Sequence, residues 1–140
     1  HRNGSGMDEP ADRISLTAPP ELIGELDALV DDLGYASRSE AIRDALRAYI
    51  TDCRWRTDTE TTKQGSIVVL YDHKSGVNDE ILSLHHKMPD VVTSVQHVHL
   101  SRHRCLETLI VESSGERISA LADRLRSLEG VQQVRLAIVG

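Results

Sequence analysis

Three residues in the second half of the chain have the side chains and the spacing of a transition-metal site. His97 and His99 lie two apart in a β-branched run, V-V-T-S-V-Q-H-V-H-L, and Cys105 opens the next apolar run. Because alternate residues of a strand point to the same face, the two imidazoles lie side by side if this run is a strand. A hairpin between the two runs would place Cys105 opposite His99 on that face. The pattern predicts two nitrogens and a thiolate that converge at one edge of a sheet.

A fourth candidate ligand, His86, precedes this group and is expected at the end of a helix. Its spacing alone does not place it beside the other three residues. Imidazoles combined with a thiolate suit nickel or copper in a planar arrangement and zinc in a tetrahedral one. The residues alone also allow a simpler interpretation, which is a polar strand face with a buried and inert Cys105.

The bulk properties are those of an ordinary globular protein. Of the 140 residues, 39% are hydrophobic, 27% are charged and 3% are aromatic. No apolar run approaches the roughly 18 residues of a membrane-spanning helix, and no secretory signal is visible. Cys53 and Cys105 occupy dissimilar contexts, so we expect free thiols in a reducing cytoplasm and no disulfide. We expect no contact with a membrane.

Motifs of enzymes are missing from the sequence. It has no paired carboxylates, no nucleophile elbow and no glycine-rich phosphate loop, so we expect a protein that is not an enzyme. The opening H-R-N-G-S-G before Met7 is interpreted as a cloning scar, and residues 1–10 are expected to be disordered.

The N-terminal part of the chain predicts one strand followed by two helices. Residues 13–17 alternate between polar and apolar types, which is typical of a short strand. Apolar residues then recur at helical spacing through residues 20–33, and Gly34 ends that helix. Ser37 and Glu40 form a capping box that begins the second helix.

A unit of this size is too small to bury two apolar helix faces, so we expect it to dimerise through its strand. A two-stranded antiparallel ribbon fits the major groove of DNA, and Arg13, Ser15 and Thr17 would face outward from it. Arg38 and the backbone N–H groups near Ser39 would anchor phosphates. The alternative is a strand face that contacts only solvent.

The net charge limits how such a unit could bind DNA. The chain carries −6 in total, which argues against indiscriminate binding to nucleic acid. Residues 11–50 contain eight acidic and four basic side chains, a net charge of −4. The basic side chains lie on the ribbon and the second helix, so the local field there is more favourable than the total. We therefore expect low DNA affinity in the metal-free protein.

The rest of the chain predicts the order strand, helix, strand, strand, helix, strand. This βαββαβ order is typical of a ferredoxin-like fold, whose sheet has one helix-covered face and edges available for oligomerisation. The expected elements are residues 66–71, 78–87, 91–100, 105–112, 115–128 and 131–139, after a polar linker at 57–64.

The order of these elements, with two motifs, resembles the nickel-responsive ribbon-helix-helix repressors. The motifs are G-Y-x-x-R-S-E-A-I-R-D at residues 34–44 and H-V-H-L-S-R-H-R-C-L-E at residues 97–107. The resemblance implies an α+β chain with a ribbon-helix-helix DNA-binding domain at 11–56, the linker at 57–64 and a ferredoxin-like (ACT-like) domain at 65–140. That second domain would sense metal and form a homotetramer, a dimer of dimers.

The resemblance also implies roles for individual residues. His97, His99 and Cys105 of one protomer, with His86 of the facing protomer, would bind Ni²⁺ in a square plane, one ion per protomer. Glu107 would be a carboxylate close to the metal. Arg13, Ser15 and Thr17 match the ribbon residues that contact operator DNA, and Glu40 and Asp44 match a pair that helps to hold a second cation between the domains.

The expected function is repression of metal-uptake genes when metal binds at the protomer interface. Three alternatives remain open: a sensor of copper, zinc or cobalt on the same scaffold, a regulator that binds a small molecule such as an amino acid, and a metal carrier. Departures from the family include Lys87, Met88 and Pro89 where further histidines are common. His73 is expected to be a loop histidine, with membership of an auxiliary metal site as the alternative.

Overall fold

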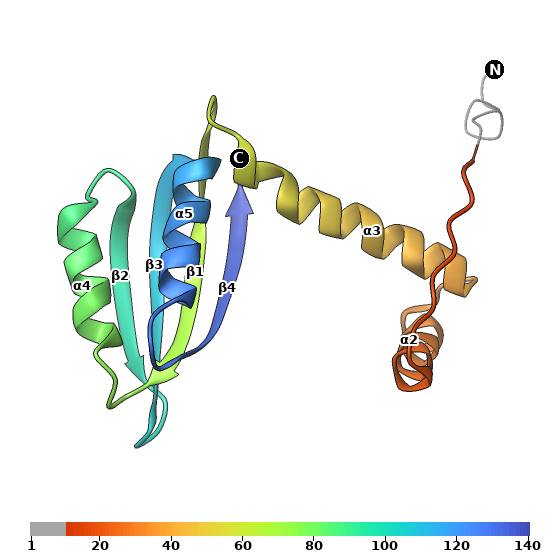
Figure 1. The fold of residues 1–140 in the computed structure, drawn as a ribbon, viewed down its shortest axis with the longest axis horizontal. Helices are drawn as coiled ribbons and strands as arrows, with labels where there is room; N and C mark the ends of the chain where they lie inside the picture. The colour runs from red at the N-terminus through yellow and green to blue at the C-terminus, as the bar shows by residue number, and fades with distance from the viewer. Residues whose placement is uncertain (1–10) are drawn as a thin grey trace. The chain divides into compact units, whose positions relative to one another are not determined.

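The computed structural model describes residues 11–140, and the expectation for residues 1–10 lies outside the described residues. The chain divides into two compact units, His1–Leu46 and Arg47–Gly140. Helix α3 (Arg38–Arg54) crosses this division (Figure 1). Among the described residues, no helix combines the length and the apolar character needed to cross a membrane.

The first unit contains helix α2 (Pro20–Leu33) and the start of α3, in agreement with the sequence prediction. Proline occupies the first turn of α2, where its missing N–H costs no hydrogen bond. Gly34 ends this helix at φ 76°, a left-handed conformation that glycine adopts without strain. Ser37 Oγ accepts from the backbone N–H of Glu40 at 3.1 Å, as the capping box predicts.

Residues 11–19 form no strand within the single protomer, although a strand was predicted at 13–17. A strand is stabilised by a hydrogen-bonded neighbour, and this unit contains no other strand among the described residues. Ile14 and Leu16 are 68% and 67% exposed. Further exposed apolar side chains on the two helices are Leu22, Leu29, Leu33 and Leu46. The unit leaves these apolar residues uncovered, as expected if a second copy buries them.

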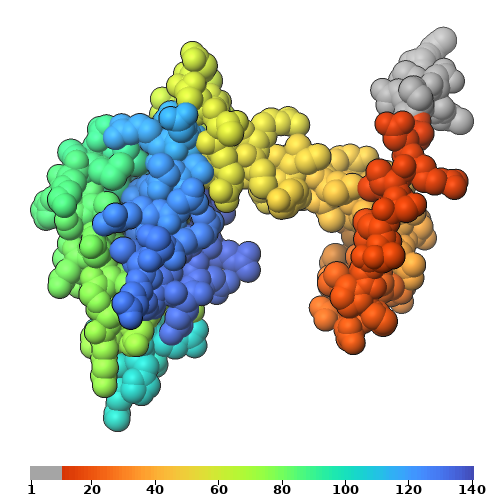
Figure 2. Space-filling view, viewed as in Figure 1, coloured from red at the N-terminus to blue at the C-terminus, as the bar shows by residue number. Residues whose placement is uncertain are grey.

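The second unit is one antiparallel sheet with strand order β2-β3-β1-β4. Helices α4 and α5 cover one face of the sheet, and their atoms close over it in the space-filling view (Figures 1 and 2). Its elements are the short helix η1 (Trp55–Thr57), β1 (Thr62–Asp72), α4 (Val77–Lys87), β2 (Val92–His99), β3 (Arg104–Ser114), α5 (Gly115–Arg126) and β4 (Val131–Val139).

This is the predicted βαββαβ order, and the bounds of the last strand are the predicted ones. The main difference is that β1 begins at Thr62, so the strand takes in part of the predicted linker. The strand is longer than predicted because β1 pairs with β3 as far as Ser114, which lies opposite Thr62 at the far end of β3. Polar residues without a sequence period can extend a strand when a long partner strand lies beside them.

The core of this unit lies between the sheet and its two helices. Alternate residues of β1 and β3 point inward, and these are Ile67, Val69, Tyr71, Cys105, Glu107, Leu109 and Val111. They pack against apolar residues of the helices, including Ile81, Ile118, Leu121 and Leu125. Glu107 is the one charged side chain in this buried set. The opposite face of the sheet is less covered, and Val98 and Ile110 are 41% and 43% exposed there.

Gly115 begins α5 where the chain passes close to η1. A Cβ atom at this position would lie 1.6 Å from the carbonyl oxygen of Trp55 and 3.3 Å from that of Asp58. Both contacts are with backbone, so relief would require the chain itself to move. The backbone N–H of Glu116 donates to Asp58 O at 3.1 Å and holds the two segments together.

We expect Gly115→Ala to lower the free energy of unfolding by about 1–3 kcal/mol, the usual cost of forcing extra atoms into a packed region. Urea denaturation followed by circular dichroism would measure it. Gly76→Ala is the matched control, because a Cβ at Gly76 would meet nothing within 4 Å. Equal stability losses in the two variants would contradict this account of Gly115.

Candidate metal centre

The hairpin of β2 and β3 determines which side chains share one end of the sheet. In its register His99 lies opposite Cys105, and His97 lies opposite Glu107. The predicted pairing of His99 with Cys105 is therefore confirmed. Side chains of directly opposed residues point to the same face, so all four belong to the helix-covered face. At this end of the sheet the two histidines are exposed, whereas Cys105 and Glu107 are buried.

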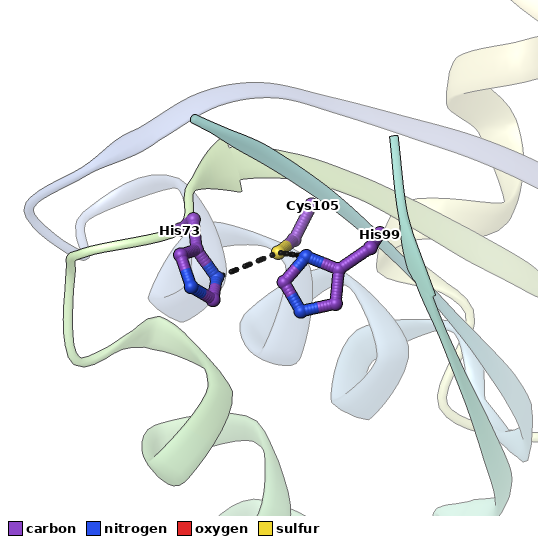
Figure 3. A group of neighbouring side chains, drawn as sticks. All are labelled: His73, His99 and Cys105. Atoms are coloured by element: carbon purple, nitrogen blue, oxygen red, sulfur yellow. Dashed lines mark hydrogen bonds between the residues drawn. The ribbon is translucent and has the colours of Figure 1, made fainter. Parts of the chain in front are cut away.

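Cys105 Sγ lies between two imidazoles (Figure 3). It is 3.5 Å from Nδ1 of His99 and 3.4 Å from Nδ1 of His73. The ring centroids of the two histidines are 4.4 Å apart. Among the described residues, His73, His99 and Cys105 are the one group of three whose candidate donor atoms all lie within 4.8 Å of one another.

The position of His73 follows from the pairing of β1 with β3. Tyr71 is the register partner of Cys105, and His73 follows two residues later, just beyond the end of the strand. Its backbone N–H donates to His103 O at 2.9 Å, which continues the contact between the two segments. From the sequence, His73 is expected to be a loop histidine, with an auxiliary metal site as the alternative. The period of two through Ile67, Val69 and Tyr71 puts His73 in line with the inward face of β1, but it does not identify the residues of β3 that His73 meets.

His97 has a different set of partners. Its Nδ1 lies 2.8 Å from Glu107 Oε1, and the Tyr71 hydroxyl donates to the same oxygen at 2.8 Å. An ionised carboxylate only accepts hydrogen bonds, so with Glu107 ionised this contact requires the proton on His97 Nδ1 and the lone pair on Nε2. This is the arrangement in which a histidine binds a metal through one nitrogen while a carboxylate orients it through the other.

Tyr71 was missed by the sequence analysis, although it is the third inward residue of β1. Burial is the main cause that raises the pKa of Tyr71 above its ordinary value, and the hydrogen bond to Glu107 raises it further. The hydroxyl therefore keeps its proton and acts as a donor. Glu107 Oε2 is buried and has no hydrogen-bond partner. The carboxylate is thus oriented entirely through its other oxygen.

His86 lies away from this group in the protomer. It belongs to the last turn of α4, and its ring stacks with that of His85 at 6.1 Å between centroids. Helix α4 ends just before β2 begins, whereas His97 and His99 are at the far end of β2. The structure therefore does not bring His86 to Cys105 within one chain.

The predicted DNA-contacting residues all lie in the first unit and are exposed: Arg13, Ser15, Thr17, Arg38 and Ser39. The Arg38 guanidinium forms two 2.9 Å hydrogen bonds with the Asp27 carboxylate, and this contact lowers the pKa of Asp27. To contact a phosphate, the Arg38 guanidinium would have to leave Asp27 or to contact the carboxylate and the phosphate at the same time.

The predicted second-cation residues are engaged in local hydrogen bonds. Glu40 Oε2 accepts from the backbone N–H of Ala36 at 3.1 Å, and Asp44 accepts from the Tyr35 hydroxyl. The hydrogen bond to Asp44 is the main cause that raises the pKa of Tyr35. These contacts account for both carboxylates without a cation, and the second-cation site stays a prediction.

The donor chemistry at the end of the sheet fits a borderline-soft divalent metal. Cys105 supplies sulfur, while His99 and His97 or His73 supply imidazole nitrogen. Such N,S sets bind nickel, copper and zinc, and they do not suit calcium or magnesium, which prefer oxygen ligands.

Removing the Tyr71 hydroxyl should weaken metal binding through His97. Loss of a group that orients a metal ligand costs about 10–100-fold in affinity, and we expect Tyr71→Phe to weaken Ni²⁺ binding by about tenfold. Competition with a chromophoric chelator would measure this. Tyr35→Phe is the matched control, since its hydroxyl also donates to a carboxylate but lies in the first unit. Unchanged Ni²⁺ affinity in Tyr71→Phe would show that the hydroxyl does not orient a nickel ligand.

Comparison with known protein families assigns a family to each half of the chain. The NikR C-terminal nickel-binding domain matches residues 64–139, and the ribbon-helix-helix protein family of copG type matches residues 12–52. A solved ACT domain, from the GTP pyrophosphokinase of Chlorobium tepidum, is 18% identical and covers 55% of this chain and 100% of that chain, with a TM-score of 0.49.

Relatives assigned as nickel-responsive regulators align over nearly the whole chain. The protein from Methanocaldococcus jannaschii is 43% identical over 91% of this chain and 92% of that protein. The protein from Methanococcoides burtonii is 36% identical over 93% of this chain and 94% of that protein. With both halves matched in the same order, this chain belongs to the nickel-responsive regulators, which are DNA-binding transcription regulators and not enzymes.

Proposed function

We propose that this protein represses metal-uptake genes when Ni²⁺ binds between protomers. In this proposal His97, His99 and Cys105 of one protomer and His86 of another bind the ion in a planar arrangement, one ion per protomer. The protein acts as a homotetramer in the cytoplasm, where a reducing environment keeps Cys105 available as a thiol.

The observation that carries the proposal is the incomplete donor set of the single chain. His99 and Cys105 meet at the end of the hairpin, and Glu107 orients His97 through Nδ1, which leaves Nε2 available for a metal. His86 is exposed on α4 and is not part of that group. The fourth ligand of a planar site is therefore best supplied by a second copy, which would make metal binding and assembly one event.

The exposed apolar residues support assembly in both units. In the first unit Ile14 and Leu16 on the predicted ribbon are uncovered, and in the second unit Val98 and Ile110 lie on the open face of the sheet. Uncovered apolar side chains are buried favourably when copies associate. Nickel at the interface would then favour one spacing of the DNA-binding dimers, so that nickel affinity and operator affinity are coupled.

The proposal predicts that Ni²⁺ raises operator affinity by at least about tenfold, within the range of ordinary allosteric coupling. Fluorescence anisotropy with a nickel-uptake promoter fragment, with and without Ni²⁺, would measure it. Arg13→Ala should abolish specific binding while Ni²⁺ affinity stays unchanged, and Arg102→Ala in the second unit is the charge-matched control. Equal operator affinity with and without Ni²⁺ would rule out nickel-dependent repression.

A second prediction concerns the ligand supplied by another protomer. His86→Ala should remove the visible absorption band of planar Ni²⁺ and weaken Ni²⁺ binding by at least about 100-fold, because a planar site loses one of its ligands. His85→Ala is the matched control, since this half-buried neighbour stacks with His86. An unchanged band in His86→Ala would exclude His86 as a ligand.

Mixed protomers would test whether His86 acts between chains. Tetramers formed from His86→Ala and His99→Ala subunits should recover part of the planar Ni²⁺ band, because each subunit supplies the ligand that the other lacks. No recovery in mixed tetramers whose assembly is verified by light scattering would mean that the ligands come from one chain.

A further inference from the structure

A recess in the second unit shares no residue with the metal centre and is lined largely by apolar side chains. It has a volume of about 500 Å³ and lies between the last turns of α3, the short helix η1 and strand β4. Figure 1 shows the C-terminal end of β4 beside the end of α3. Its apolar walls include the half-buried side chains of Trp55, Val134, Leu136 and Ile138. Recesses of about 300–1,000 Å³ with mainly apolar walls are typical of small-molecule sites.

Positive side chains outnumber negative ones around this recess. Its lining contains Arg56, Arg126 and Arg135, and Asp52 is the one acidic residue among the lining residues. Arg135 lies between two inward residues of β4, so alternation turns it to the other face and it reaches the recess only at the rim. Arg56 and Arg126 are therefore the cations beside the apolar walls, and Asp52 offsets one of these two charges.

The two arginines have N–H groups to spare. Arg56 forms no ion pair with any described residue, and its guanidinium lies over the ring of Trp55, 5.5 Å from the centroid. A cation–π contact of this kind fixes the position of the guanidinium without using its N–H donors. Arg126 donates through Nη1 to Asp123 at 3.2 Å, which leaves most of its five N–H groups available.

Strand β4 supplies further donors along the same recess. It is an edge strand that pairs with β1 on one side, so the backbone N–H groups on its other side have no strand partner among the described residues. Guanidinium and backbone N–H groups both form strong hydrogen bonds with a carboxylate. A neutral apolar ligand would leave these donors without partners, whereas a carboxylate would accept from them.

We propose that this recess binds a small carboxylate with an apolar chain. The carboxylate accepts hydrogen bonds from Arg56 and Arg126, and the apolar chain covers Trp55 and the half-buried side chains of β4. The recess lies apart from the residues of the proposed nickel set, so the proposal goes beyond nickel-dependent repression and does not rest on it.

The chain contains two natural reporters of this recess. Trp55 is its only tryptophan, so intrinsic fluorescence reports on the lining directly. Octanoate should give a saturable fluorescence change. Octan-1-ol lacks the charge and acetate lacks the chain, and each should bind at least about tenfold more weakly. Cys53 also lines the recess and is half-buried, whereas Cys105 is buried, so octanoate should slow the alkylation of Cys53 by iodoacetamide.

Arginine variants test the assigned donors. Arg56→Gln and Arg126→Gln should each weaken octanoate binding by about tenfold, because each loses a charged hydrogen-bond donor. Arg54→Gln and Arg124→Gln are the matched controls, since these exposed arginines lie two residues away on the same segments and outside the lining. The controls should bind octanoate as the wild type does, and thermal unfolding would verify the fold of all four variants.

Three results would overturn the proposed carboxylate site. One is equal affinity for octanoate and octan-1-ol, which would mean that the charge is not recognised. Another is wild-type octanoate affinity in both Arg56→Gln and Arg126→Gln. The third is the absence of a saturable octanoate signal together with fluorescence and Cys53 reactivity that depend on protein concentration, which would show that a second copy covers the recess.

Discussion

The register of the β2–β3 hairpin is the constraint on which the rest of the metal centre depends. Side chains alternate between the two faces of a sheet, so a slip of one residue would move a whole strand's side chains to the other face. The observed register aligns His99 with Cys105 and His97 with Glu107. The same alternation sends Leu109 and Val111 into the core. Packing of the core therefore stabilises the alignment of the donors.

Local sequence rules predicted much of this structure because the relevant interactions are short-range. The capping box at Ser37, the glycine stop at Gly34 and the pairing of His99 with Cys105 each depend on residues close together in the chain. By contrast, the strand expected at residues 13–17 is absent from the single protomer. Its pairing would need a second chain, and a single copy cannot supply that.

The position of His73 and the role of Tyr71 could not be read from local spacing. Both depend on the ladder between β1 and β3, which joins residues more than thirty positions apart, such as Tyr71 and Cys105. A pattern within β1 indicates which residues face inward, but it does not indicate which residues of another strand they meet. Long-range register is set by the packing of the complete sheet.

Cys105 combines a buried sulfur with exposed imidazole neighbours, and this has a consequence for the chemical durability of the protein. Oxidation of cysteine to sulfenic and higher acids requires an oxidant to reach the sulfur, and buried thiols react slowly. Because Cys105 is fully buried, its sulfur should be oxidised slowly even when no metal is bound. The burial that completes the core thus also preserves the one thiol on which the metal centre depends.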